Sequence, residues 1–278
     1  MIKVVTDSSV DLPPDMARDL DVTVVPLSIH FGDRTYIDGE DIDATTFYRL
    51  LRTEPTHPRT AQPSVGRFEE AFRRIAAGGH EIVAITIASS LSGTFNSASV
   101  AARNVPEARV TVVDSGTASM AIGSMVIRAA RLGREGQSAE QIKAVLDEMR
   151  PRLNIFLLVE TLSYLQRGGR IGRASSLVGT LLDIKPIITL KDGVVTPLRR
   201  VRTHNKALQE IVTLVSGDAP IEEIYVMHAD AKAEAERLAS MLRPVVGDIP
   251  VPVHPLGPVV GVHIGPGSLG TALLRAER

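Results

Sequence analysis

Residues 82–94 read Ile-Val-Ala-Ile-Thr-Ile-Ala-Ser-Ser-Leu-Ser-Gly-Thr, an apolar run that ends in a serine-rich turn. Residues 82–87 are rich in Ile and almost continuously apolar, which is typical of a parallel strand buried on both faces. The small hydroxyl residues that follow are suited to begin a helix, because their oxygens accept backbone N–H bonds. This stretch therefore predicts a strand, a turn and a helix, the unit from which α/β folds are built.

The same pattern recurs along the chain. Residues 68–75 and 142–149 place apolar side chains at i, i+3, i+4 and i+7, the spacing of one buried helix face. Further short runs predict strands at Ile2–Thr6, Val22–Ile29, Val110–Asp114, Ile155–Val159, Pro186–Leu190, Ile224–His228 and Val251–His254. Alternation of strands with helices predicts an α/β fold.

We expect two α/β domains, residues 1–150 and 151–278, with the boundary near Arg150-Pro151, give or take about ten residues. The first domain should hold a mostly parallel sheet with flanking helices. In the second, Lys191-Asp192-Gly193 lies between two strand-like runs and predicts a hairpin, hence a mixed sheet with helices. The stretch Thr53–Ser64 is expected to form a long loop.

Composition excludes several functional classes. The 278 residues include 31 Lys+Arg, 32 Asp+Glu and no Cys. A net charge of −1 argues against a nucleic-acid partner bound by bulk electrostatics. Without Cys there is no disulfide framework, Cys-ligated zinc, iron–sulfur cluster or thiol nucleophile. No apolar run approaches the ~18 residues of a membrane span, and Asp7 interrupts the apolar start, so we expect a cytoplasmic protein without integral membrane association.

Three polar clusters follow predicted strands: residues 6–9, 88–94 and 114–117. Helix capping explains each cluster taken alone. In a parallel sheet, however, all three would meet at the carboxyl edge, where α/β proteins bind ligands. Together they favour a site for a polar head group. Ser92-Gly93-Thr94 is the best candidate, because Gly permits close approach and the next helix N-terminus favours an anion.

The glycine pattern Gly265–Gly270 matches GxGxxG, but it lacks the following helix and acidic residue of a dinucleotide site. We expect a tight turn before a final strand instead. No Walker A motif is present. His263 lies in a Gly- and Pro-rich stretch where small neighbours would let a ligand approach. No HExxH spacing occurs, so a metal site is not expected.

Two groups of arginines have two interpretations each. Arg167, Arg170 and Arg173 either form a solvated helix end or clamp an anion. Arg200 and Arg202 are expected on one face of a strand, either merely exposed or as a docking patch for an acidic or phosphorylated partner.

Taken in order, the chain's motifs resemble the DegV family of bacterial lipid-binding proteins, over essentially its whole length. The supporting runs are Thr6-Asp7-Ser8, Thr60-Ala61-Gln62-Pro63-Ser64, Leu91-Ser92-Gly93-Thr94, Asp114-Ser115, Tyr164-Leu165-Gln166-Arg167-Gly168-Gly169-Arg170-Ile171, Lys185-Pro186-Ile187 and Gly261-Val262-His263-Ile264-Gly265-Pro266-Gly267. Ala61, Ala88 and Val262 stand where the family commonly has Ser, Ser and Thr, which leaves fewer hydroxyls for secondary contacts.

The resemblance implies a protein that binds one long-chain fatty acid, of C14–C18, between its two domains, and that has no catalytic residue or cofactor of its own. The family's carboxylate-binding residues match Thr60, Ser92 and His263, and its GGR arginine matches Arg170. Ser90, Gly93 and Thr94 are candidates for additional pocket residues.

In some bacteria, similar proteins carry the acyl chain for a fatty acid kinase. A separate subunit, similar to dihydroxyacetone kinases, phosphorylates the bound acid with ATP, and the acyl-phosphate feeds phospholipid synthesis. The resemblance makes Arg202 a candidate for docking this partner.

Two alternatives remain open from the residues alone. A lipid or acyl ester hydrolase could use Ser92 as nucleophile and His263 as base. Against it, Ser90 and Thr94 occupy the glycine positions of a G-x-S-x-G elbow, and Asp7 and Asp114 are only candidates for the orienting acid. The second alternative is a carrier of another amphipathic acid.

Overall fold

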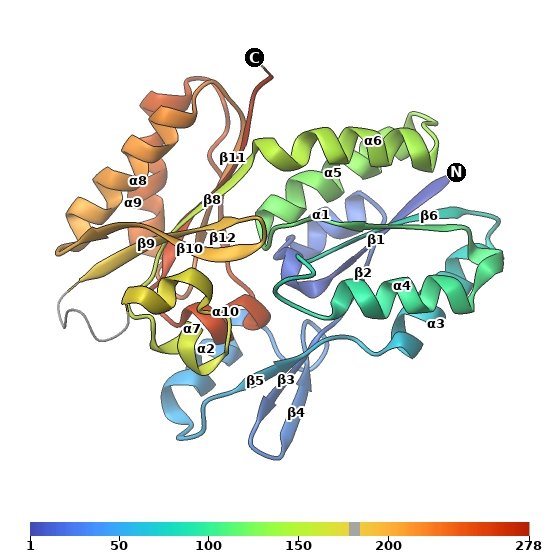
Figure 1. The fold of residues 1–278 in the computed structure, drawn as a ribbon, viewed down its shortest axis with the longest axis horizontal. Coiled ribbons are helices and arrows are strands. Elements are labelled where there is room, and N and C mark those ends of the chain that lie inside the picture. Colours follow the sequence, from blue (N-terminus) through green and yellow to red (C-terminus); the bar gives the residue numbers. More distant parts are fainter. Residues whose placement is uncertain (178–183, 278) are drawn as a thin grey trace.

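The computed structural model describes residues 1–177 and 184–277. Within them two large β-sheets lie side by side, each with its own helices (Figure 1). The α/β class predicted from the sequence is confirmed, with a parallel first sheet and a mixed second one.

The first sheet is parallel throughout and has the order β2-β1-β6-β7. Alternate residues of its central strands enter two different cores: Val4 and Val83 face one, Val5 and Ala84 the other. Helices α5 and α6 cover the first face, and α3 and α4 cover the second. Its elements are β1 (Ile2–Asp7), α1 (Pro14–Asp19), β2 (Val22–Val25), α3 (Val65–Ala77), β6 (Glu81–Thr86), α4 (Thr94–Asn104), β7 (Val110–Asp114), α5 (Met120–Arg134) and α6 (Ala139–Met149).

The second sheet has the order β10-β9-β8-β13-β11-β12, and only its β11–β12 pair is parallel. The predicted hairpin at Lys191-Asp192-Gly193 joins β9 to β10. One face of this sheet packs against α8 and α9. The side chains of its other face belong to the apolar core that also contains α5. Its elements are β8 (Leu153–Leu158), β9 (Lys185–Lys191), β10 (Val194–Val201), α8 (His204–Asp218), β11 (Ile221–His228), α9 (Lys232–Val246), β12 (Val253–Pro255) and β13 (Leu269–Arg275).

Helix α6 ends at Met149 and β8 begins at Leu153, so the boundary expected near Arg150-Pro151 falls between the two sheets. The division of the chain into two folding units stays a prediction. No helix in residues 1–177 or 184–277 has both the length and the apolar character needed to cross a bilayer.

Two predictions about the N-terminal half were wrong. The strand expected at Val22–Ile29 is two strands, because Pro26 has no backbone N–H to continue the ladder after Val25. The loop expected at Thr53–Ser64 contains the short strand β5 (Arg59–Ala61), which pairs with β3. With β3 (Ser28–Phe31) and β4 (Arg34–Ile37) it forms a small antiparallel sheet, placed beside α2 (Ala44–Thr53), α7 (Ser163–Arg167) and α10 (Pro258–Ile264) in Figure 1.

The expected turn and final strand after Gly265 are confirmed, since Gly265 and Gly267 have φ of 75° and 82° and β13 begins at Leu269. Gly270 allows β13 to lie close to β8. A Cβ at this position would lie 1.9 Å from the carbonyl oxygen of Phe156 on β8. His263, expected in a loop, lies instead in the last turn of α10.

Gly270→Ala should therefore destabilise the protein by more than about 3 kcal/mol, because backbone of two paired strands must separate. Gly217→Ala in α8 is the matched control. Its Cβ meets nothing within 4 Å, so it should leave stability unchanged or raise it by about 0.5–1 kcal/mol. Urea unfolding of the three proteins measures both effects, and equal stability of the two variants would contradict the packing argument.

Candidate functional site

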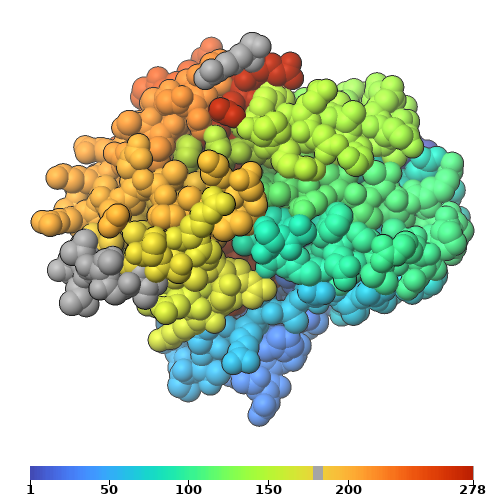
Figure 2. All heavy atoms as spheres, viewed as in Figure 1, coloured from blue at the N-terminus to red at the C-terminus, as the bar shows by residue number. Residues whose placement is uncertain are grey.

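A pocket that encloses about 770 Å³ of space between protein atoms, open solvent included, lies between the carboxyl ends of the first sheet's strands and one face of the second sheet. Figure 2 shows the yellow segment that contains α7 seated between the orange C-terminal part and the blue N-terminal part, beside this pocket. The pocket is thus built from segments far apart in the sequence.

One wall of the pocket is an apolar sheet face. Ile155 and Leu157 on β8, Ile188 and Leu190 on β9, and Val195 on β10 all line it. Side chains two residues apart on a strand point to the same face of the sheet. This part of the second sheet therefore offers an apolar surface to a ligand.

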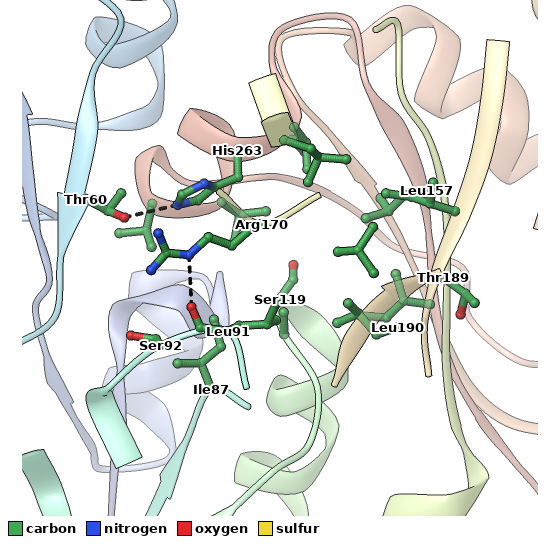
Figure 3. A pocket seen from close by; sticks show the side chains of 18 of the residues that line it. Thr60, Ile87, Leu91, Ser92, Ser119, Leu157, Arg170, Thr189, Leu190 and His263 are labelled. Atoms are coloured by element: carbon green, nitrogen blue, oxygen red, sulfur yellow. Dashed lines mark hydrogen bonds between the residues drawn. The ribbon is translucent and has the colours of Figure 1, made fainter. Parts of the chain in front are cut away.

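The opposite end is polar. Figure 3 shows Thr60, Ser92, Arg170 and His263 gathered at one end, while Leu157 and Leu190 lie at the other. Strand β5 positions Thr60, the turn after β6 positions Ser92, the segment after α7 positions Arg170 and helix α10 positions His263. The structure brings the four principal predicted residues together.

His263 is neutral in this setting. Burial, followed by the charges of Arg170 and His57, lowers its pKa to about 4. Its Nε2 lies 3.0 Å from the Thr60 hydroxyl oxygen, and its Nδ1 is shut off from solvent without a hydrogen-bond partner in the described chain. With the proton on Nε2, His263 donates to Thr60, and the Thr60 hydroxyl keeps its own proton for a ligand.

Ser92 is oriented by its neighbours. Its hydroxyl lies 2.8 Å from the Thr94 hydroxyl and accepts from the Thr94 N–H at 3.3 Å. Gly93 packs against Gln62, whose Oε1 would lie 2.1 Å from a Cβ there. Gly93 and Thr94 therefore position Ser92 and do not line the pocket themselves.

Ser90 also lies outside the pocket lining. Its hydroxyl donates to the carbonyl oxygen of Gly193 at 2.8 Å, so it ties the turn after β6 to the β9–β10 hairpin. This contact joins the two halves of the chain beside the pocket.

Of the three spaced arginines, only Arg170 reaches the pocket. Gly169, with φ of 68°, turns the chain after α7, so Arg167 and Arg173 stay exposed while Arg170 points inward. Arg170 donates from Nε to the Leu91 carbonyl oxygen at 3.0 Å and from Nη1 to that of Gly168 at 2.8 Å. It is thus a fixed positive charge beside His263.

The shared strand face expected for Arg200 and Arg202 is wrong. Strand β10 ends at Val201, and its register shifts between Pro197 and Arg199, so Arg202 lies beyond the strand. Both side chains are exposed and distant from the pocket lining.

The acidic residues of the polar clusters accept hydrogen bonds from backbone N–H groups. Asp7 accepts from the Ile87 N–H at 2.8 Å, and burial raises its pKa. Asp114 accepts from the Ser89 and Gly116 N–H groups at 3.1 and 3.0 Å. They shape the turn that carries Ser92. This is not the helix capping considered from the sequence, because α4 begins after Gly93, which makes no side-chain cap bond.

Sequence reasoning missed Ser119 and Thr189, which also line the pocket. Ser119 has φ of 54° and ψ of −145°, an unusual conformation that no sequence pattern marks. In the part of the chain that the structure describes, no group of three His, Asp or Glu side chains is arranged to hold a metal ion.

Three comparisons place the chain among known proteins. A family model described as an uncharacterised protein of the DegV family matches residues 1–276. A DegV domain-containing protein of Halalkalibacterium halodurans is 39% identical over 273 residues, which span 97% of this chain and 96% of that one. One from Streptomyces coelicolor is 37% identical and spans 98% of both.

Solved structures agree. A fatty-acid-binding DegV family protein of Thermus thermophilus superposes with a TM-score of 0.91, at 36% identity and 99% coverage of both chains. A stearic-acid-binding protein of Eubacterium ventriosum also gives 0.91, at 29% identity, covering 99% of this chain and 98% of its own.

Gly168→Ala should disturb the polar end selectively. A Cβ there would lie 2.2 Å from Nδ1 of His263, while its φ of −76° suits alanine. The imidazole must shift, which disturbs its contact with Thr60 and its burial, so its pKa should rise from about 4 toward its ordinary value near 6.5. NMR titration of the His263 ring measures this. Gly66→Ala, whose nearest contact is an ordinary 3.9 Å, is the control.

Proposed function

This chain belongs to the DegV family, and from that premise we propose that it binds one long-chain fatty acid between its two halves. The observation that carries the proposal is the pocket itself, with an apolar sheet face at one end and four polar side chains at the other. The acyl tail lies along the sheet face, Thr60 and Ser92 donate to the carboxylate, and His263 takes part by orienting the Thr60 hydroxyl. The protein acts in the cytoplasm and has no turnover of its own.

The tail supplies the affinity. At roughly 0.8 kcal/mol per buried CH₂, a sixteen-carbon chain brings on the order of 11 kcal/mol of gross transfer free energy. The ordering costs of association reduce this figure. The strand residues Leu157 and Leu190 offer the apolar surface that the tail requires.

The head group sets the orientation. A buried carboxylate is costly unless donors meet it, and a hydrogen bond to a charged group contributes about 1.5–3 kcal/mol. Thr60 and Ser92 each carry a hydroxyl, and Arg170 supplies positive charge beside them. A neutral His263 orients Thr60 by hydrogen bonding, without adding a second full charge.

The second part of the proposal is that the protein presents the acyl carboxylate to a separate ATP-dependent kinase subunit, which forms an acyl-phosphate for phospholipid synthesis. Two observations support it. The sequence has no Walker A motif for a nucleotide of its own. Basic groups also surround the polar end: burial and the charges of Arg167 and Arg59 lower the pKa of His57, which in turn acts on His263. Such a rim suits the extra negative charge that phosphorylation adds.

The hydrolase alternative finds less support. A serine nucleophile needs a base within hydrogen-bond reach. His263 Nε2 is engaged by Thr60, and the Ser92 hydroxyl is engaged by Thr94.

The bound molecule tests the first part directly. Denaturing extraction of the purified protein should release a C14–C18 fatty acid in near-stoichiometric amount, as mass spectrometry detects, with an unrelated protein from the same host as control. Release of another amphipathic acid would redefine the ligand. A protein that is empty and takes up no added fatty acid would refute the proposal.

The head-group assignment has its own test. Thr60→Val with Ser92→Ala should weaken fatty-acid affinity at least about tenfold, because two donors to a buried charge are lost. Ser90→Ala is the matched control, since its hydroxyl binds the Gly193 carbonyl outside the pocket lining. Calorimetric titration compares the three, and unchanged affinity in the double variant would remove Thr60 and Ser92 from the site.

Partner docking is assigned to Arg200 and Arg202, which are exposed and outside the pocket. Their replacement by Glu should slow acyl-phosphate formation with a kinase subunit by about tenfold or more, through charge reversal at the contact. Fatty-acid affinity should not change. A full rate with both charges reversed would place the docking surface elsewhere.

A further inference from the structure

A partly buried carboxylate lies beside the pocket, on Asp11, a residue outside the lining. Asp11 follows the short 3₁₀ turn Ser8–Val10, in a left-handed conformation with φ of 53°. Its Oδ1 accepts from the backbone N–H of Gly257 at 2.8 Å, and its Oδ2 accepts from the Ser119 hydroxyl at 2.5 Å. One side chain thus joins three segments that are distant in sequence.

Both partners of Asp11 belong to the pocket's framework. Gly257 is the residue before α10, and Val259, Val260, His263 and Ile264 of that helix all line the pocket. Ser119 lines the pocket directly and immediately precedes α5. Because α10 also carries the hydrogen bond to Thr60, any shift of its first residue moves the polar end.

The chemistry of these contacts calls for a carboxylate. Gly257 N–H can only donate, so the side chain that faces it must accept there. Oδ2 of Asp11 accepts from the Ser119 hydroxyl, which also lies 3.1 Å from Sδ of Met227. Asparagine offers a single acceptor oxygen, whereas an ionised aspartate offers two. The fit at Gly257 is close, since a Cβ there would lie 2.8 Å from Oδ1 of Asp11.

The surroundings of Asp11 disfavour the charged form of its carboxyl group. Burial is the main cause that raises its pKa to about 7, and the neighbouring charges of Asp38 and Asp7 raise it further. Burial, followed by the charge of Asp11, raises the pKa of the Tyr48 phenol on α2. An acid with a shifted pKa beside a binding pocket is a candidate for a functional role.

We propose that Asp11 is a positioning residue of this pocket: its carboxylate fixes the start of α10 and the Ser119 wall, and so sets the place of His263. Its effect on ligand affinity rests on the proposed function, whereas its effect on His263 does not.

The test uses the full chain with Asp11→Ala and the near-isosteric Asp11→Asn. Both should raise the His263 pKa above its value of about 4, as α10 shifts and water reaches the ring, with Ala giving the larger change. Both should weaken binding of palmitate, and Asp11→Ala should do so about tenfold, the expected effect of losing a hydrogen bond to a charged group. NMR titration and calorimetry give the two readouts.

Asp38→Asn is the matched control. Asp38 is buried in the same neighbourhood, burial raises its pKa to about 6, and its side-chain bond goes to Ser8 rather than to α10 or Ser119. It should leave the His263 titration and palmitate affinity unchanged.

The outcomes separate the two proposals. An unchanged His263 pKa in folded Asp11→Asn, or an equal shift in Asp38→Asn, would overturn the positioning role. If Asp11→Ala does not fold, Asp11→Asn decides the matter alone. A wild-type protein that binds no fatty acid would refute the proposed function, yet the His263 titration would still decide the role of Asp11.

Discussion

The second sheet has an apolar core on each face, and the pocket lies within the core of one of them; the rest of the architecture follows from this. Helices α8 and α9 cover the first face with a closed apolar core. On the other face, α5 packs against part of the sheet and the pocket occupies the remainder. An apolar surface left bare is unfavourable in water, at about 25 cal/mol per Å². The apolar side chains of this face are therefore kept from water, and the turns that follow the strands of the first sheet, together with α10, line the opposite side of the pocket.

The polar end solves a different problem, which is to meet a charge far from bulk water. It does so with contacts that span the chain: Thr60 and His263 are 203 residues apart, and Asp11 and Gly257 are 246 apart. Each element contributes one group, so no local segment contains the site. The carboxylates of Asp7 and Asp114 accept hydrogen bonds from backbone N–H groups of the turn after β6, and so fix the turn that carries Ser92.

Periodicity made the α/β class and most strands predictable, because buried parallel strands and amphipathic helices leave strong local patterns. The end of β2 at Val25 could have been predicted from Pro26, which cannot donate to a strand ladder. Strand β5 is too short to show an alternation of apolar and polar residues. Ser92, Arg170 and His263 were singled out from their local sequence, whereas Thr60 and the carboxylate-binding role came only from the ordered resemblance. Asp11 and Ser119 could not be found this way, because their meaning arises only from a contact 108 residues apart.

The glycines around the pocket carry a consequence for how mutational data on this protein would be interpreted. A Cβ on Gly270 would lie only 1.9 Å from the carbonyl oxygen of Phe156, and one on Gly172 only 2.6 Å from that of Val195, although neither glycine lines the pocket. In a saturation screen scored by ligand retention, such positions would tolerate as little change as Ser92 or His263. Intolerance to substitution would therefore outline the scaffold together with the ligand's contacts, and only a comparison of affinity with folding stability would separate the two.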